Sequence, residues 1–213
     1  MKYLPKLTAM ALSVAMVASL AACSSSDPSA SPAQSAGGDT GTQGGQDSYT
    51  IGVCQQMQHE ALDAATQGFQ DALKEKLGDQ VEIKVENASG DSNNCNTIVG
   101  SFVSNGVDLI MANGTTALQA AASATEDIPI LGTSITEYGV ALGIDGFTGT
   151  TGYNVSGTSD LAPLDQQAEM LHTWFPDAQT VGLLYCSAEP NSQYQVDTVQ
   201  GYLEDLGYTC TQY

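Results

Sequence analysis

The regular alternation of short apolar runs with segments of helical periodicity constrains the fold of this 213-residue chain more than any other feature. Four short runs are rich in aliphatic and β-branched residues, which favour strands; they lie at 49–54, 81–86, 107–112 and 128–131. Three segments between them repeat apolar residues every three or four positions, as helices do; these are 59–77, 92–105 and 115–124. Strands that alternate with helices form βαβ units, so we predict an α/β fold with a parallel sheet and helices on both faces.

The alternating pattern pauses and then restarts. Residues 133–158 are rich in Gly and Thr and show no clear period. After them we expect two helices and two strands, at 163–174, 181–185, 191–206 and from 208 onward. We therefore predict a first α/β lobe over 49–158, nearly complete, and the start of a second α/β lobe over 159–213, present only in part.

The N-terminus has the features of a bacterial lipoprotein leader. Lys2 and Lys6 precede an apolar run, 7–20, that is too short to span a membrane. The run ends at Leu20-Ala21-Ala22-Cys23, which matches the lipobox at which lipoprotein signal peptidase cuts. We expect residues 1–22 to be a signal peptide and Cys23 to carry a diacylglycerol and a further acyl chain. An ordinary secretory signal with an incidental cysteine is the alternative.

The segment that follows predicts a tether. Residues 24–48 contain no Leu, Ile, Val, Phe or Trp and consist mainly of Ser, Gly, Ala, Asp, Gln, Thr and Pro. Such a segment buries too little apolar surface to offset its ordering entropy, so we expect 23–48 to be disordered. The protein would then be anchored through lipid on Cys23 at the extracytoplasmic face of the cell membrane.

The charge balance narrows the range of partners. The chain has no Arg, and once the leader is removed three Lys face 24 acidic residues. A strongly acidic surface argues against nucleic acid and against anionic substrates held by Arg.

Four cysteines remain when Cys23 is lipidated: Cys54, Cys95, Cys186 and Cys210. None has the spacing of a metal site, so we predict neither a metal nor another cofactor. An even number outside the cytoplasm permits disulfides, and of the three pairings we favour Cys54–Cys95 with Cys186–Cys210. Buried free thiols are the alternative.

Polar loops follow the expected strands and would meet at one edge of the sheet. They are rich in hydroxyls, amides and helix N-termini and poor in bases; they are 54–59, 113–116, 132–136, 158–160 and 187–192. Helix N-termini bind carboxylates, and a free Asp binds an ammonium, so the loops together favour an amino acid as ligand. The alternative is that these residues only cap helices and form turns.

Several motifs resemble one protein family in a constant order. They are Ile51-Gly52-Val53, Ala61-Leu62-Asp63, Asn87-Ala88-Ser89-Gly90-Asp91, Asp127-Ile128-Pro129, Asn154-Val155-Ser156-Gly157-Thr158-Ser159-Asp160 and Ser187-Ala188-Glu189-Pro190-Asn191-Ser192. The chain from residue 51 to its end is similar to the substrate-binding lipoproteins of ABC importers, of the type that binds tryptophan and other aromatic amino acids.

This resemblance implies a periplasmic-binding-protein type I-like fold that holds a small ligand between two lobes and docks on an ABC permease. Gly114, Thr115, Thr116, Thr133 and Ser134 would then donate to a ligand carboxylate, and Asp160 would bind an ammonium. The full set of ligand-binding residues that it implies is Gln55, Gln58, His59, Gly114, Thr115, Thr116, Thr133, Ser134, Ser159, Asp160, Ser187, Glu189, Asn191 and Ser192.

The chain departs from the family pattern near the expected pocket and in length. Thr115-Thr116 stands where relatives have Thr-Pro, Glu137-Tyr138 replaces an Asp-Pro pair, and Pro190 is added beside Glu189. Ligand identity is therefore not transferred. The family's second lobe needs more strands than 159–213 supplies, so we expect a truncated chain or a fragment.

Other functions fit less well. Neither Ser134 nor Ser187 lies in a nucleophile elbow, and Gly114-Thr115-Thr116 lacks the lysine of a P-loop, so we do not expect an enzyme. A sugar- or nucleoside-binding receptor or a sensory receptor of the same fold is the alternative to an amino-acid importer component.

Overall fold

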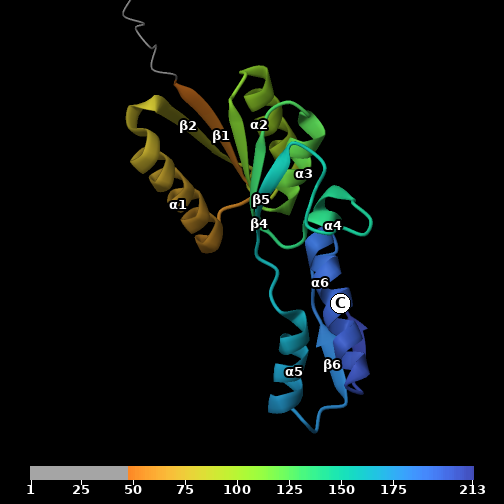
Figure 1. Cartoon of the computed structure of the whole chain (residues 1–213). Helices are drawn as coiled ribbons and strands as arrows, with labels where there is room; N and C mark the ends of the chain where they lie inside the picture. The colour runs from red at the N-terminus through yellow and green to blue at the C-terminus, as the bar shows by residue number, and fades with distance from the viewer. Residues whose placement is uncertain (1–47) are drawn as a thin grey trace, which may run out of the picture. The chain divides into compact units, whose positions relative to one another are not determined.

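The computed structural model describes residues 48–213. The expected signal peptide, Cys23 and the tether up to residue 47 lie outside the described residues. The larger unit is a five-stranded parallel sheet in the order β2-β1-β3-β4-β5 (Figure 1). Its strands are β1 (Tyr49–Gln55), β2 (Val81–Asn87), β3 (Leu109–Asn113), β4 (Ile130–Ile135) and β5 (Val155–Ser159).

Helices connect these strands and cover both faces of the sheet. They are α1 (Glu60–Leu77) with the 3₁₀ turn η1 (Gly78–Gln80), α2 (Ser92–Ser104), α3 (Thr115–Ala124) and α4 (Tyr138–Leu142). The chain steps from β1 to β2 in one direction, and from β2 onward it moves the other way across the sheet. Because such crossovers are right-handed, α1 lies on one face and α2 and α3 on the other. This arrangement confirms the α/β fold with helices on both faces.

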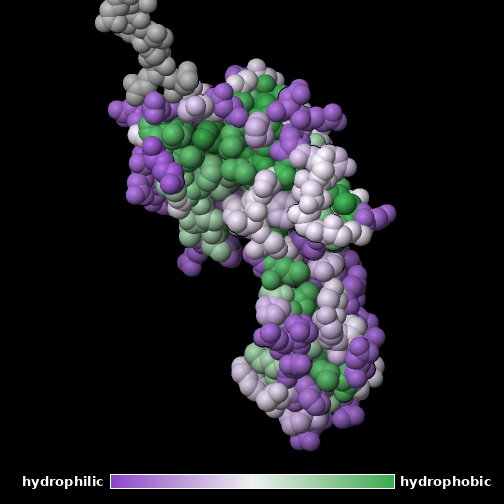
Figure 2. All heavy atoms as spheres, viewed as in Figure 1, coloured by the Kyte–Doolittle hydropathy of each residue, from purple (hydrophilic) through white to green (hydrophobic). Residues whose placement is uncertain are grey.

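The two faces are packed differently. On the side of α2 and α3, strand and helix side chains form one apolar core that includes Cys54, Cys95, Val99, Phe102, Ile110, Leu118 and Ala121. On the other side the strands bury Val53 and Met111, but the only buried residue of α1 is Thr66. An apolar hollow of about 560 Å³ lies there, lined by Tyr49, Ile51, Leu73, Leu77, Asp108 and Leu109. Figure 2 shows hydrophobic residues at the surface in this region.

The remaining residues form a smaller α/β unit. It consists of α5 (Leu164–Trp174), β6 (Thr180–Leu183), α6 (Pro190–Asp205) and β7 (Thr209–Gln212). The two strands are parallel, and Ala168, Leu203 and Tyr208 form a small core beside them. Large apolar side chains such as Leu184 and Trp174 are exposed. The restart of the strand–helix pattern after residue 158 is confirmed, whereas the domain boundaries stay a prediction.

Two elements in 133–158 were not expected from the sequence. Strand β5 has the sequence Val-Ser-Gly-Thr-Ser, and only Val155 is buried. Because β5 lies at the edge of the sheet, it packs on the core through a single apolar side chain and shows no apolar run in the sequence. Helix α4 has five residues, which is too short for a helical period to be visible.

Candidate functional site

The order of the strands changes direction between β1 and β3, and the region outside the carboxyl ends of these strands is called the crevice below. The helix after β1, α1, lies on one face of the sheet and the helix after β3, α3, lies on the other, so the loops after these neighbouring strands run in opposite directions. Ligands of open α/β sheets bind at such a point, outside the carboxyl ends of the strands. The Gln56 N–H donates to the Asn113 carbonyl (2.9 Å) and holds the two loops together.

Gln55, an expected ligand residue, lies inside the protein. Its side chain is 4% exposed, and its Nε2 donates to Asp63 Oδ1 (2.6 Å) and to the Met57 carbonyl (2.9 Å). Its Oε1 accepts a hydrogen bond from Thr66 Oγ1 (2.7 Å). Because both ends of the amide are bonded within the protein, Gln55 fixes the start of α1 against β1.

Asn113 extends this polar cluster to β3. Its Nδ2 donates to the Leu62 carbonyl (2.8 Å) and to Thr66 Oγ1 (2.9 Å). Asn113 is 0% exposed, and its Oδ1 has no hydrogen-bond partner among the described residues. The cluster of Gln55, Asp63, Thr66 and Asn113 therefore joins α1 to the carboxyl ends of β1 and β3.

Gln56, which was not among the expected residues, lies at the crevice. Its Oε1 accepts from the Thr116 N–H at the start of α3 (3.0 Å), and its Nε2 donates to Glu189 Oε1 (3.1 Å). Side chains alternate along a strand, so when Gln55 points toward α1 the next residue points to the other side. Gly114 leaves room for it, because a Cβ there would lie 2.6 Å from Gln56 Oε1, and its φ of 109° also favours glycine.

Gln58 and His59 are exposed beyond the end of β1. His59 Nδ1 accepts from the Ala61 N–H (3.2 Å), so the imidazole caps the N-terminus of α1. Thr115 is buried and Thr116 half-buried in the first turn of α3, next to the crevice.

The ends of β4 and β5 lie side by side and supply further polar groups. Thr133 Oγ1 lies 3.5 Å from Thr158 Oγ1, and Ser134 has a positive φ of 56°. Ser159 Oγ donates to the Thr136 carbonyl (2.7 Å), and the Asp160 N–H donates to the Ile135 carbonyl (3.0 Å). The Asp160 carboxylate is therefore held by its backbone at this edge, where it is exposed.

Tyr138 lies beneath this edge. Its hydroxyl donates to the Gly132 carbonyl (3.0 Å) and lies 3.3 Å from the Thr158 carbonyl. Burial, reinforced by the nearby Asp160 carboxylate, raises the pKa of Tyr138 to about 12. The phenol therefore stays neutral at physiological pH and acts as a hydrogen-bond donor.

In the smaller unit, the expected residues lie around the start of α6. Ser192 Oγ accepts from the Cys186 N–H (3.0 Å), and the Asn191 carbonyl accepts from Gln195 Nε2 (3.3 Å). Ser187 is exposed, and half-buried Glu189 contacts Gln56 as described above. Glu189 is thus the one residue of this group whose side chain is hydrogen-bonded to the crevice in this structure.

The cysteines fall into two groups. Cys54 on β1 and Cys95 in the first turn of α2 are both buried in the same core and share a side-chain hydrogen bond. In the smaller unit, Val181 is paired with Cys210, so Cys186 lies five residues further along the strand direction. At about 3.3 Å per residue that offset is roughly 16 Å, which exceeds the reach of a disulfide. The strand register thus does not accommodate the expected Cys186–Cys210 pair.

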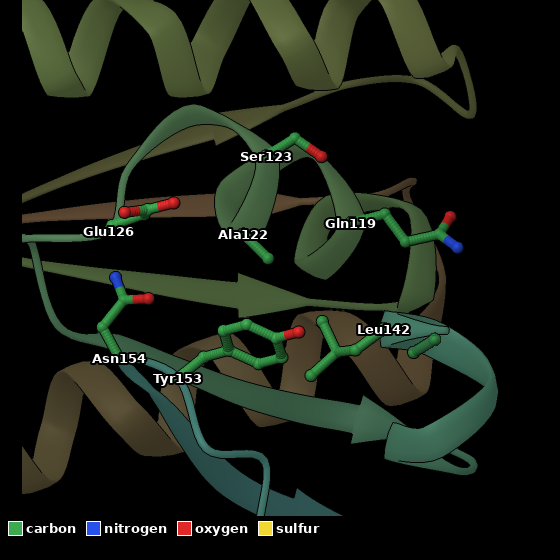
Figure 3. Close-up of a pocket in the computed structure, with 8 residues that line it drawn as sticks. Gln119, Ala122, Ser123, Glu126, Leu142, Tyr153 and Asn154 are labelled. Atoms are coloured by element: carbon green, nitrogen blue, oxygen red, sulfur yellow. The ribbon is translucent and has the colours of Figure 1, made fainter. Parts of the chain in front are cut away.

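Another cavity lies away from this edge. It has a volume of about 370 Å³ and is lined by Gln119, Ala122, Ser123, Glu126, Ala141, Leu142, Tyr153 and Asn154 (Figure 3). Glu126 and Asn154 precede β4 and β5, so this cavity lies at the amino ends of the strands and does not belong to the crevice.

The crevice presents groups that can form hydrogen bonds with a polar solute. It offers backbone N–H groups, hydroxyls and amides from the larger unit and two carboxylates, Asp160 and Glu189. Within 48–213 no three His, Cys, Asp or Glu side chains are grouped as metal ligands. No helix in that range is both long and apolar enough to cross a membrane.

Comparison with known proteins identifies the family of the chain. A family model described as ABC transporter substrate binding protein matches residues 50–212. The tyrosine-binding protein of Clostridioides difficile (strain R20291) is 39% identical over 161 residues, which cover 74% of this chain and 46% of that protein.

Solved structures agree with this assignment. The ABC domain from Streptococcus pneumonia in complex with L-Trp is 37% identical to this chain, with a TM-score of 0.72. The ligand-free, open structure of a substrate binding protein with adhesive properties from Clostridium difficile is 38% identical, with a TM-score of 0.60. Each alignment covers 78% of this chain and 57% of the other chain. The chain thus spans about half the length of the relatives it matches.

Proposed function

Because the chain belongs to the family of ABC transporter substrate binding proteins, we propose that it serves as the solute-binding component of an ABC importer. It would capture a small ligand, an amino acid, at the crevice and deliver it to a permease in the membrane. The observation that carries this proposal is the gathering of the loops after β1, β3, β4 and β5 at one edge, beside the point where the chain changes direction across the sheet.

The charges at the crevice support an amino acid as ligand. The first turn of α3 presents the N–H groups of Thr115 and Thr116, which suit a carboxylate. The exposed Asp160 carboxylate at the end of β5 suits an ammonium. The relatives named above include a tyrosine-binding protein and a domain in complex with L-Trp, which favours an aromatic side chain on the ligand.

The expected ligand residues then take different roles. Those at the ends of β3, β4 and β5 contact the ligand: Gly114, Thr115, Thr116, Thr133, Ser134, Ser159 and Asp160. Gln58 and His59 lie at the edge of the ligand site. The smaller unit contributes four residues to its far side: Ser187, Glu189, Asn191 and Ser192. Gln55 acts as a positioning residue, because its amide is bonded inside the protein.

We also propose that the protein is anchored outside the cytoplasm by lipid on Cys23. Substrate-binding proteins of this family work on the extracytoplasmic side and are generally not enzymes. The leader and lipobox of the sequence support an anchor that leaves the folded part within reach of a membrane permease.

Calorimetric titration of the purified protein with single L-amino acids tests the proposal. We expect L-Tyr or L-Trp to bind, and Asp160→Asn to weaken that binding about tenfold or more, because a charge-assisted hydrogen bond is lost. Asp145→Asn, which removes an exposed carboxylate outside the crevice, is the matched control and leaves affinity unchanged.

Sugars and nucleosides are titrated in the same experiment. Binding of glucose or adenosine with no response to any amino acid would replace the amino-acid proposal by the sugar or nucleoside alternative. Binding of an amino acid that is insensitive to Asp160→Asn would remove Asp160 from the site but leave the function in place. A sensory role is separated by asking whether the protein docks on a permease or on a membrane kinase.

A further inference from the structure

Two cysteines far apart in the sequence meet in the core of the larger unit. Cys54 lies next to the last residue of β1, and Cys95 closes the first turn of α2. Both are 0% exposed, and both belong to the apolar core on the α2 side of the sheet. Their side chains are hydrogen-bonded to each other, and in this structure both are thiols.

The backbone around the pair is fixed on both sides. The Ala88 N–H donates to the Gln55 carbonyl (2.9 Å), and the Gly90 N–H donates to the Gln56 carbonyl (2.8 Å). These bonds join the loop before α2 to the residues that follow Cys54. The Cys95 N–H donates to the Asp91 carbonyl (3.1 Å), so the start of α2 is ordered by the same loop. These backbone hydrogen bonds fix the start of α2, which carries Cys95, against the end of β1, which carries Cys54.

The pair differs from the other cysteines of the described residues, Cys186 and Cys210. Cys186 is exposed, and the register of β6 with β7 separates it from Cys210 by about five residues along the strand, roughly 16 Å. Within the described residues, Cys54 and Cys95 are thus the pair whose placement suits a direct bond.

We propose that Cys54 and Cys95 form a disulfide that cross-links β1 to α2 directly beneath the crevice. The family works outside the cytoplasm, where thiol–disulfide oxidants are available. The cross-link would hold the loop before α2 against Gln55 and Gln56, and so fix the wall on which Gln56 meets Thr116. This inference depends on where the protein is exported and not on which solute it binds.

The chemistry balances with a disulfide oxidant such as oxidised glutathione. The Cys95 thiolate attacks one sulfur of the oxidant, forms a mixed disulfide and releases one glutathione thiolate. The Cys54 sulfur, having lost its proton to solvent, then attacks the Cys95 sulfur and releases the second. Two S–H bonds are lost, one protein S–S bond forms, and the two electrons reduce the oxidant to two thiols.

Protonation indicates when this reaction takes place. The hydrogen bond with Cys95, together with burial, raises the pKa of the Cys54 thiol, while the same hydrogen bond lowers the pKa of Cys95. Cys95 is therefore the thiol that ionises more readily once this packing begins to form. Because both sulfur atoms are inaccessible in the folded protein, an external oxidant reaches them while the chain is folding.

The test is a trapping experiment on the purified protein. The protein is unfolded under reducing conditions, refolded in a buffer of reduced and oxidised glutathione, quenched with N-ethylmaleimide and digested for peptide mass spectrometry. We expect the Cys54 and Cys95 peptides to be joined and to separate on reduction. Cys186→Ser, the control at an exposed position, leaves this cross-link intact. The refolded protein is alkylated in denaturant, so that buried thiols also react. Maleimide adducts on both Cys54 and Cys95 under these conditions, or bonds from either one to Cys186 or Cys210, would overturn the proposal.

A second measurement shows whether the bond belongs to the native packing. It closes a loop between residues 54 and 95, so reduction should lower the melting temperature by on the order of 10 °C. The Cys54→Ala/Cys95→Ala double variant should melt at the same temperature with and without reductant. A cross-link whose reduction leaves the melting temperature of the original protein unchanged, or raises it, would show that the native fold does not favour the bond.

Discussion

The two faces of the five-stranded sheet are built by different means. On the face of α2 and α3, Phe102, Ile110 and Leu118 pack into a continuous apolar core. On the face of α1, the helix buries only Thr66 and is joined to the sheet by the polar cluster of Gln55, Asp63, Thr66 and Asn113. The first face is stabilised by burial along its whole length, whereas the second is held by hydrogen bonds at its carboxyl end and is hollow at its amino end.

The two faces therefore have different roles: one stabilises the fold, and the other positions the loops of the crevice. The polar cluster lies directly behind the crevice, so the α1 face fixes the loops at which we place the ligand. The apolar face stabilises the fold through the burial of its side chains. Substitutions on the two faces should therefore have effects of different size and kind.

The largest effect is expected at the centre of the apolar face. Phe102 is 2% exposed, and its ring packs so closely on β1 that a Cβ at Gly52 would lie 2.5 Å from it. Phe102→Ala should lower the free energy of unfolding by about 3–5 kcal/mol, because a large cavity is left. Urea denaturation followed by circular dichroism measures the change, and a loss below about 1 kcal/mol would contradict the packing described here.

A smaller effect is expected at high pH. Burial raises the pKa of Tyr138 from 10.0 to about 12, so between these values the unfolded chain loses the proton that the folded protein keeps. The stabilisation is complete below pH 10 and is lost as the pH rises toward 12, by up to about 3 kcal/mol. Urea titrations at several pH values measure it. Tyr138→Phe is the control: this part of the pH dependence should disappear, at a constant cost of about 1 kcal/mol for the hydrogen bonds lost.

On the polar face, Asn113→Ala should lower stability by about 2 kcal/mol, because the Leu62 carbonyl and Thr66 lose their buried donor. Ligand affinity should fall as well, since the loop before α3 loses its connection to α1. Thermal unfolding and calorimetric titration measure the two effects separately. Unchanged affinity in a folded Asn113→Ala variant would mean that the cluster has no positioning role.

The smallest effect is expected at the hollow. Leu73 is only half-buried on α1 and lines the open space beside β1. Leu73→Ala should cost less than about 1 kcal/mol, far below the 2–5 kcal/mol typical of Leu→Ala in a closed core. A loss as large as that of Phe102→Ala, measured by the same denaturation, would show that the two faces are equally packed.

Much of the fold follows from local pattern. The runs 49–54 and 107–112 overlap β1 and β3, because buried parallel strands select aliphatic and β-branched residues. The run 81–86 falls within β2, an edge strand whose apolar residues alternate with charged ones. Helix α1 was likewise expected from its period of apolar residues. The same period also indicated a buried face, yet Leu73 and Leu77 are only half-buried. A period shows which side of a helix is apolar but not how closely another layer packs on it.

The site was predictable only at the level of loops. Parallel strands bring their carboxyl ends to one edge, so the polar loops were expected to meet there, and those after β1, β3, β4 and the unexpected strand β5 do. Which side chains face the crevice depends on which alternate residues of each strand point to that side of the sheet. Gln55 and Gln56 are the same residue type in adjacent positions, and only the hydrogen bonds to Thr66 and Thr116 distinguish them. The contact with Glu189 joins positions 133 residues apart, which no local pattern reveals.

The position of Gln56 has a thermodynamic consequence for any solute. Its amide oxygen already occupies the Thr116 N–H, so a ligand that uses this donor exchanges one acceptor for another. A neutral oxygen gains almost nothing from the exchange, since the bond that it makes equals the bond that it breaks. An anionic oxygen gains the difference between a charged and a neutral hydrogen bond, roughly a factor of two in strength. Gln56 therefore competes with the ligand for the Thr116 N–H, and an anionic ligand oxygen displaces it more readily than a neutral one does.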